Sequence, residues 1–500
     1  MLNYAKVGKP AAIPVAVGNV VMVVALLVPL AAADRWIEVK SANVTVVAST
    51  NAGMARELVW QLEQIRSAIK AVWPWAKVDI ERPLLVFAVG NEADMRVLLP
   101  KYWESRNSVK PASLMITSPD HSLVAIRADL KAEGQSDVNP HATTYFSYVT
   151  LILDGSIDAD LPPWLARGLA QVMSNTIVRD GKVFVGTPIQ RNLQVIAERS
   201  RLLLPALVQM KADAPELRTD DGLSRFDAQS WALVHMLMFG NDGARQKALN
   251  QFLQLLVGRM DADKAFREAL GAPETLEADY NQYLSRAIYS FLQLNVDVAV
   301  KREGFSQRDL TAAEAAALRS LFYTATARPI EARAAFVEAR KGDAAAETYF
   351  AEGLLLEREG KRDEARQAYE QAVTAGSKSP YAHYRLATLR WTPNPSPDAL
   401  KGIDQLLTRA VTLNSRHADA YSMLAEVRSL LGGENAFGMA VRATQLQPGK
   451  ASHRLVAARI LMREKRYDEA LKVLQTATAL PMSPEEAKMA RELQAAIERK

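Results

Sequence analysis

The hydrophobic pattern of the first part of the chain changes between strand-like and helix-like periods. Residues 36–40 and 44–47 alternate apolar and polar positions, which is typical of half-buried strands, and a helical period covers residues 51–69. Residues 84–89 are continuously apolar, as expected for a central strand. The turn-rich residues 118–121 separate two further apolar runs and predict a hairpin. This part of the chain therefore predicts a small mixed sheet with at least one helix.

Helical periods dominate from residue 142 onward, interrupted by one short strand at residues 183–185. Together with the preceding sheet they predict an α+β region that spans residues 34–295. The expected helices cover about residues 142–153, 162–178, 190–200, 226–239, 244–258 and 276–293.

Beyond about Leu310 the pattern becomes that of alanine-rich paired helices. Small residues recur at intervals of 34, 38 and 33 residues, which predicts stacked helical hairpins. Residues 392–397 insert a proline-rich stretch into the second unit. Residues 296–344 are predicted to be a linker that includes a further, degenerate hairpin within 312–341. The small residues that define the repeat are Gly353, Ala387, Ala425 and Ala458.

These repeats resemble tetratricopeptide repeats over about residues 345–482, with a polar capping helix at 483–500. The resemblance rests on bulky and small residues at matching offsets, such as Tyr349 and Gly353 in the first unit. It implies an all-α solenoid whose groove binds a protein or peptide partner, because aromatic and arginine side chains suit an extended or acidic segment. Packing between repeats is the alternative role at each position. The expected groove residues are Phe350, Arg358, Tyr381, Tyr384, Trp391, Arg459 and Arg463.

The first 33 residues have the pattern of an export signal. Lys6 and Lys9 precede an uncharged, mostly apolar stretch that ends in the small residues 31–33. An uncleaved membrane anchor is the alternative, since the apolar stretch is long enough to cross a bilayer. We therefore expect a periplasmic or secreted protein at the cell envelope, which contacts a membrane only if this segment is retained.

Composition removes several classes of function. The 61 basic and 56 acidic residues of this 500-residue chain leave a net charge of +5, which is too small to imply a nucleic-acid partner. The absence of cysteine excludes disulfides, thiolate metal sites and a cysteine nucleophile. No two of the six histidines are four residues apart, so a helical His-Glu-x-x-His zinc site is excluded, and no cofactor is predicted.

Three strings nevertheless resemble the gluzincin-type peptidase MA-like domain of exported bacterial proteins. They lie at residues 145–153, 161–170 and 228–237, in the order that this family shows. The resemblance implies a gluzincin-like fold for residues 34–295. It also implies two histidines and a glutamate base on the first helix, and a glutamate as the third zinc ligand on the second.

The positions that match this zinc site carry no suitable ligands. Phe146 and Thr150 match the two histidines, Ser147 matches the general base, and Arg167 matches the third ligand. A phenyl ring, two alcohols and a guanidinium cannot hold a dication. The departures from the family therefore predict a non-catalytic pseudo-metallopeptidase domain joined to the repeats, a protein-interaction scaffold.

Two other functions remain open from the sequence. In a hydrolase with altered, non-zinc chemistry, Arg167 would bind an anionic group while Ser147 or His235 handles protons. In a purely structural spacer, neither region would bind anything. For the scaffold we expect Arg167 to be ion-paired internally or exposed. We further expect His235 to be a satisfied core histidine and His141 to be a capping or surface residue.

Overall fold

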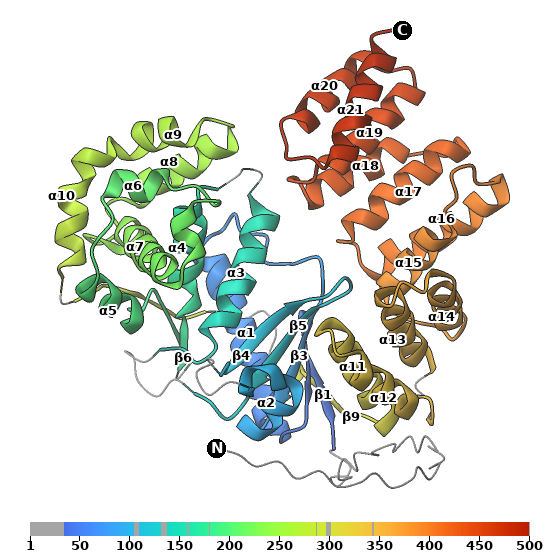
Figure 1. Cartoon of the computed structure of the whole chain (residues 1–500), viewed down its shortest axis with the longest axis horizontal. Coiled ribbons are helices and arrows are strands. Elements are labelled where there is room, and N and C mark those ends of the chain that lie inside the picture. Colours follow the sequence, from blue (N-terminus) through green and yellow to red (C-terminus); the bar gives the residue numbers. More distant parts are fainter. Residues whose placement is uncertain are drawn as a thin grey trace, which may run out of the picture. The chain divides into compact units, whose positions relative to one another are not determined.

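The computed structural model describes residues 35–104, 110–131, 138–157, 159, 161–179, 181–286, 288–296, 302–342 and 345–499 (Figure 1). Residues Arg35–Lys500 form one compact unit. The export signal predicted at residues 1–33 lies outside the described residues. None of the helices in the described ranges is long and apolar enough to cross a membrane.

A mixed six-stranded sheet forms the centre of the N-terminal region, in the order β4-β5-β3-β2-β1-β9. The three strands β2, β3 and β5 are parallel, and the others pair antiparallel at the two edges. Every residue of β3 is buried, as the sequence predicted for a central strand. The strands are β1 (Ile37–Lys40), β2 (Val44–Ala48), β3 (Leu84–Val89), β4 (Ser113–Thr117), β5 (Ser122–Arg127) and β9 (Ser306–Asp309).

Strand β9 corrects the prediction that residues 296–344 are a linker. It pairs antiparallel with β1, so that Gln307 lies opposite Val39, and it thereby completes the sheet. The helix pair α11 (Ala312–Ala325) and α12 (Pro329–Ala339) follows directly. All four residues of β9 are exposed, so no apolar alternation marked this strand in the sequence.

The two faces of the sheet bury two different cores. Along β3, Val86 and Ala88 join the core that includes α1 (Ala52–Val72), whereas Phe87 joins the core that includes α11. The Phe87 and Phe322 rings lie 4.7 Å apart between their centroids. This second core continues through the helical array as far as Val427. The array is therefore packed onto the sheet.

Helices α4, α5, α6, α8 and α10 pack against α7, whose residues 228–239 are all buried (Figure 1). The helix predicted at 276–293 ends at Leu284, and β8 then pairs with β7 in a second, three-stranded sheet. The remaining elements are α2 (Glu92–Leu98), α3 (Ala142–Ser156), α4 (Pro163–Ser174), β6 (Ile177–Arg179), β7 (Lys182–Val185), α5 (Gln190–Glu198), α6 (Leu204–Gln209), α7 (Asp220–Phe239), α8 (Gln246–Val257), α9 (Ala262–Leu270), α10 (Pro273–Leu284) and β8 (Leu292–Leu294).

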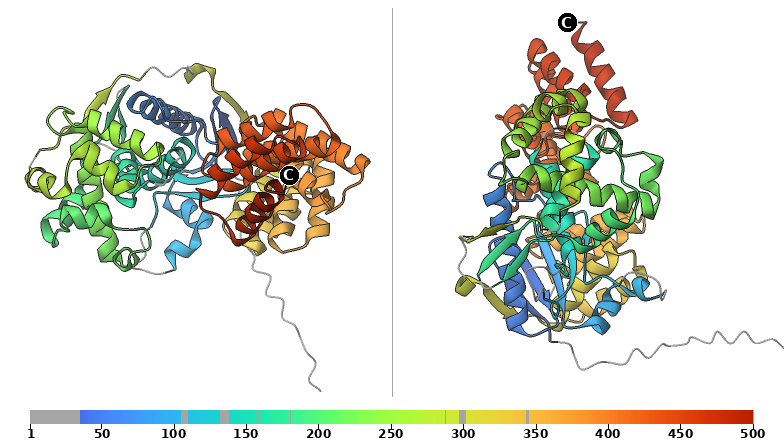
Figure 2. Two further views of the ribbon diagram at one scale, coloured as in Figure 1. Left: turned by 90° about the horizontal axis from the view of Figure 1, so that it is seen from above. Right: turned by 90° about the vertical axis from the view of Figure 1, so that its left-hand side faces the viewer.

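The C-terminal part is an array of helix pairs that stack in sequence order (Figures 1 and 2). Gly353 permits the close crossing within the first predicted unit, because an added Cβ would lie 2.6 Å from the Tyr369 ring. The array starts with α11 and α12, so the degenerate hairpin expected within 312–341 is present as a helix pair. Its other helices are α13 (Ala345–Arg358), α14 (Arg362–Thr374), α15 (Pro380–Arg390), α16 (Pro397–Leu413), α17 (Ala418–Leu431), α18 (Ala436–Leu446), α19 (Ala451–Arg463), α20 (Tyr467–Thr478) and the final helix α21 (Pro484–Ile497).

Candidate functional site

Helix α3 carries three of the positions that matched the zinc site. The Ser147 hydroxyl donates to the carbonyl of Thr143 at 3.1 Å, and the Thr150 hydroxyl donates to the carbonyl of Phe146 at 2.9 Å. Both alcohols are thus bonded back to the preceding turn of their own helix, as short hydroxyl side chains commonly are.

Arg167 lies on the neighbouring helix α4 and meets Phe146. Its guanidinium carbon is 5.5 Å from the centroid of the Phe146 ring. Two of its nitrogens donate to the two carboxylate oxygens of Asp227 on α7, and the Nη2–Oδ2 distance is 2.6 Å. The cation is therefore paired within the N-terminal region, which is one of the two arrangements expected for it. Within the described ranges, no group of three or more histidine, aspartate and glutamate side chains is arranged to hold a metal ion.

His235 is a fully satisfied core histidine, as the sequence predicted. It is completely buried, its Nδ1 lies 2.6 Å from the Tyr283 hydroxyl, and its Nε2 lies 2.6 Å from the carbonyl of Gly186. Burial lowers the pKa of His235 to about 4, so the ring is neutral at pH 7.

His141 differs from its prediction as a capping or surface residue. It precedes α3, yet its side chain does not cap the helix and is only 3% exposed. Neither ring nitrogen has a hydrogen-bond partner within the described part of the chain, and burial lowers the pKa of His141 to about 4. The sequence missed this burial because a polar residue beside Pro140 is more often found at a surface.

Three of the predicted groove residues form a row of aromatic rings on α13 and α15. The Phe350 and Tyr381 centroids are 6.4 Å apart, and those of Tyr381 and Tyr384 are 6.1 Å apart. Phe350 is only 5% exposed and packs between repeats. The two half-buried tyrosines line a cavity of about 200 Å³, and burial raises the pKa of Tyr384 to about 12.

The predicted arginines and Trp391 do not line this cavity. Arg459 and Arg463 on α19 both pair with Glu426 on α17, at 3.0 and 2.6 Å, and therefore connect neighbouring repeats. Trp391 packs against the core that the array shares with the sheet. Arg358 is exposed at the end of α13.

Sequence reasoning missed Arg385, which lies beside Tyr384 and lines the same cavity. Its Nε is 3.1 Å from both carboxylate oxygens of Glu357, and the Tyr369 hydroxyl donates to that carboxylate at 2.7 Å. The position next to a predicted groove tyrosine was the available signal. The ion pair itself joins α13 to α15 and was not evident from the sequence.

The opposite wall of the cavity belongs to the N-terminal region. It consists of Glu81, Arg82 and the β4–β5 turn at Pro119 and Asp120. A larger cavity of about 560 Å³ shares Glu81 and Asp120 with the first and extends along the ends of the sheet strands. The cleft between the array and the N-terminal region is therefore lined by both.

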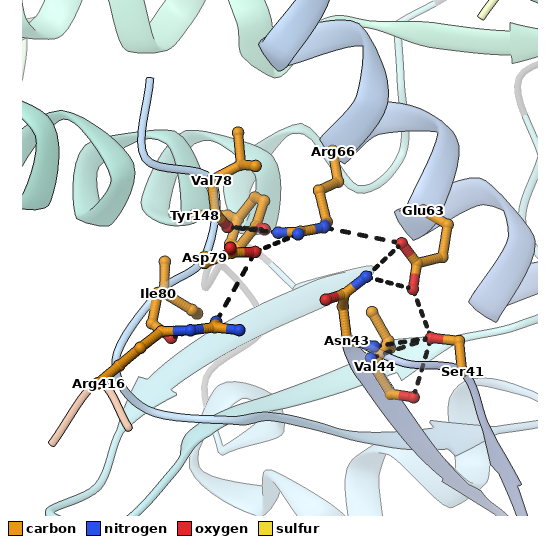
Figure 3. Close-up of polar contacts among 10 residues, drawn as sticks. All are labelled: Ser41, Asn43, Val44, Glu63, Arg66, Val78, Asp79, Ile80, Tyr148 and Arg416. Atoms are coloured by element: carbon orange, nitrogen blue, oxygen red, sulfur yellow. Dashed lines mark hydrogen bonds and ion pairs between the residues drawn. The ribbon is translucent and has the colours of Figure 1, made fainter. Parts of the chain in front are cut away.

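A polar network lies along this larger cavity (Figure 3). The buried Glu63 accepts hydrogen bonds from Ser41 and Asn43 and lies 3.8 Å from Arg66. Arg66 also pairs with Asp79, and Arg416 of the array lies 3.7 Å from the same carboxylate. The network thus connects the sheet, α1 and the array.

The charges of this network decide its protonation states. Partial burial would raise the pKa of Asp79, but the hydrogen bond and charge of Arg66 and the charge of Arg416 outweigh it, so the pKa is lowered. Burial raises the pKa of Tyr148, whose hydroxyl lies 3.3 Å from the Val78 carbonyl. Asp79 is therefore ionised and Tyr148 neutral at pH 7.

Comparison with known proteins supports the repeats alone. Residues 346–375, which cover most of α13 and α14, match the tetratricopeptide repeat family model. No curated protein matches the chain. The C-terminal part thus contains tetratricopeptide repeats. The family match lies outside residues 34–295 and gives no support to a peptidase MA-like domain there.

The solved structures that are similar to part of the chain include the following three, each covered almost completely. YrrB, described as a TPR protein with an unusual peptide-binding site, is 21% identical, with 36% of this chain and 92% of that chain covered and a TM-score of 0.31. PilF of Pseudomonas aeruginosa is 16% identical, with 38% of this chain and 91% of that chain covered and a TM-score of 0.29. A thermophilic TPR protein of Thermus thermophilus is 17% identical, with 37% of this chain and 98% of that chain covered and a TM-score of 0.27.

Proposed function

We propose that this protein is an interaction scaffold whose repeats bind an extended peptide or protein segment in the cleft beside α15. The observation that carries the proposal is the pair Tyr381 and Tyr384, whose half-buried rings line a cavity next to Arg385. Amphipathic rings and an arginine in a concave site are typical of protein-binding surfaces. The tetratricopeptide repeats support binding of a protein or peptide.

The test is selection of binding peptides from a random library displayed against the purified protein. Peptides that bind in the cleft lose affinity when Tyr384→Ala removes the ring, by about 30-fold for a central aromatic contact of about 2 kcal/mol. Tyr467→Ala on α20 is the matched control, because Tyr467 does not line the cavity. Peptides that bind equally to both variants would place recognition elsewhere and reject the cleft.

We infer further that residues 34–295 are a pseudo-metallopeptidase domain. Support comes from the meeting of Phe146 and Arg167 on neighbouring helices, since the resemblance predicts that these positions converge. Metal analysis of the purified protein tests this inference, and stoichiometric zinc together with peptide cleavage would overturn it.

The alternative is a hydrolase of altered chemistry. It requires Arg167→Ala to abolish turnover while the fold is retained.

We also propose that residues 1–33 direct export. The support is the charge and apolar pattern of the sequence described above. N-terminal sequencing of the protein recovered from the periplasm or the medium tests it, and recovery of the full-length chain from the cytoplasm alone would reject it.

A further inference from the structure

Residues 77–82, here called the docked segment, lie between the N-terminal region and the array. They connect the end of α1 to β3 and contain no helix or strand. On the N-terminal side, Arg66 donates to the Val78 carbonyl at 2.8 Å. On the other side, the docked segment contacts residues 414–418 and 445–450 of the array, here called the loop edge. They comprise the α16–α17 and α18–α19 connections with the adjoining ends of α17 and α18.

The loop edge binds two backbone carbonyls of the docked segment. The Asn414 amide donates to the carbonyl of Glu81 at 2.9 Å, and Arg416 donates to the carbonyl of Ile80 at 3.4 Å. Lys77 donates in return to the carbonyl of Gln445 at 3.3 Å. Main-chain hydrogen bonds of this kind bind an extended chain whatever its side chains are.

The side-chain carboxylate of Glu81 adds a specific contact. One oxygen accepts the backbone N–H of Ala418 at 3.0 Å, at the first residue of α17, and the other accepts the Gln447 amide. The positive end of the helix dipole and the free N–H groups of the first turn both favour an anion there. Nδ1 of His417 lies 3.3 Å from the same carboxylate.

A second carboxylate two residues earlier meets the same edge. Asp79 lies 3.7 Å from Arg416, and its side chain is 49% exposed. The spacing Asp-x-Glu therefore places one carboxylate at Arg416 and the next at the start of α17. The edge thus combines two anion contacts with two carbonyl contacts, as a site for an extended peptide with carboxylates in this spacing requires.

We propose that the loop edge is a recognition site for an extended segment of a partner protein that presents two carboxylates in this spacing, and that Lys77–Arg82 occupies this site in cis. The partner carries an aspartate or glutamate two residues before a glutamate, and it competes with the docked segment. This proposal rests on the proposed scaffold function and names its partner class. The contacts on the array side are polar and the segment has no regular structure, as local release of a segment requires.

The experiment separates the internal ligand from its site. In an opened variant, Asp79→Ala with Glu81→Ala removes both carboxylates from the full-length protein. The probe is a fluorescent peptide with the sequence of residues 77–83, measured by anisotropy. We expect the opened variant to bind this peptide at least about tenfold more tightly than wild type does, because the cis competitor is weakened. Asp398→Ala with Glu492→Ala is the matched control, since both carboxylates are exposed elsewhere on the array.

Two further measurements assign the binding to the loop edge. A peptide with glutamine in place of the glutamate should lose most of its affinity, and Asn414→Ala with Gln447→Ala in the opened variant should abolish binding. Circular dichroism establishes that each variant is folded.

The proposal is overturned if the opened variant binds no peptide, or binds both peptides equally. Unchanged hydrogen exchange at residues 78–82 in the opened variant also overturns it, since capture would then not depend on the carboxylates. A concentration-dependent wild-type dimer that Glu81→Ala removes would assign the edge to a second copy instead. Glu81 and Asn414 line the same cavity as Tyr384, so the scaffold function is tested by peptide selection on the wild-type protein and on Tyr384→Ala, which leaves the docked segment and the loop edge unchanged. Failure of this proposal is therefore distinguishable from failure of the scaffold function.

Discussion

Two arginine–aspartate pairs show how differently this chain uses the same chemistry. Arg167 and Asp227 join α4 to α7 inside the N-terminal region, with side chains 33% and 23% exposed. Arg416 and Asp79 join the array to the N-terminal region, with side chains 40% and 49% exposed. The first pair makes two direct hydrogen bonds, whereas the second is a longer contact at 3.7 Å.

The difference separates two kinds of site. The Arg167–Asp227 pair, here called the closed site, has a fixed internal partner, whereas the loop edge can exchange the segment that it binds. At the closed site, Arg167 contacts both Phe146 and Asp227, so its charge is already paired. At the loop edge, the partner of the array is a segment without regular structure, so another segment of the same chemistry can replace it. The loop edge is therefore a better candidate for a binding function than the closed site is.

The largest effect on the free energy of unfolding is expected where α4 crosses α7, next to the closed site. A Cβ added to Gly168 would lie 2.5 Å from Val234 and 2.6 Å from the carbonyl oxygen of Ser230, so Gly168→Val should force α4 away from α7. We expect a loss of about 3 kcal/mol in the free energy of unfolding, measured by urea denaturation.

Gly402 provides the control on α16, because a Cβ there would have no neighbour within 4 Å. Gly402→Ala should stabilise the protein by up to about 1 kcal/mol through helix propensity. Equal effects of the two substitutions would mean that α4 and α7 are not in close contact.

A change of pH should alter the free energy of unfolding by a similar or smaller amount. The pKa of buried His235 is lowered from 6.5 to about 4, so the unfolded state binds a proton that the folded state excludes between these values. Stability is therefore retained above pH 6.5 and falls as pH decreases toward 4, by at most about 3 kcal/mol for this residue.

Thermal unfolding at a series of pH values measures the slope of stability against pH. His235→Gln should flatten it in part only, because the pKa values of His141 and His453 are also lowered to about 4. A variant with the wild-type slope and a lower overall stability would show that His235 does not exclude a proton.

Much of the fold followed from apolar patterns. Residues 84–89 and the helix pairs from residue 345 onward were evident because their burial repeats along the chain. Strand β9 was not evident, since its four residues are exposed and its place depends on pairing with β1.

The candidate site was predictable only where a single helix carries it. Tyr381 and Tyr384 share one face of α15, so the repeat register indicated them. The contact between Glu81 and Gln447 joins positions 366 residues apart, and neither residue belongs to a motif. Such a contact depends on the packing of the array onto the sheet, which no local pattern encodes.

The smallest effects test the comparison of the two ion pairs directly. Asp227→Asn removes the charge from a partly buried, doubly hydrogen-bonded pair and should cost about 1.5 kcal/mol of unfolding free energy. Arg416→Gln removes the charge from the more exposed pair, leaves the bond between Arg66 and Asp79 in place, and should cost about 0.5 kcal/mol or less. Urea denaturation at low and high salt measures both, and the Arg416 effect should be the more salt-sensitive because solvent screens exposed charges. If Arg416→Gln proved as costly as Asp227→Asn, the docked segment would be a fixed part of the fold, and its exchange for a partner segment would be ruled out.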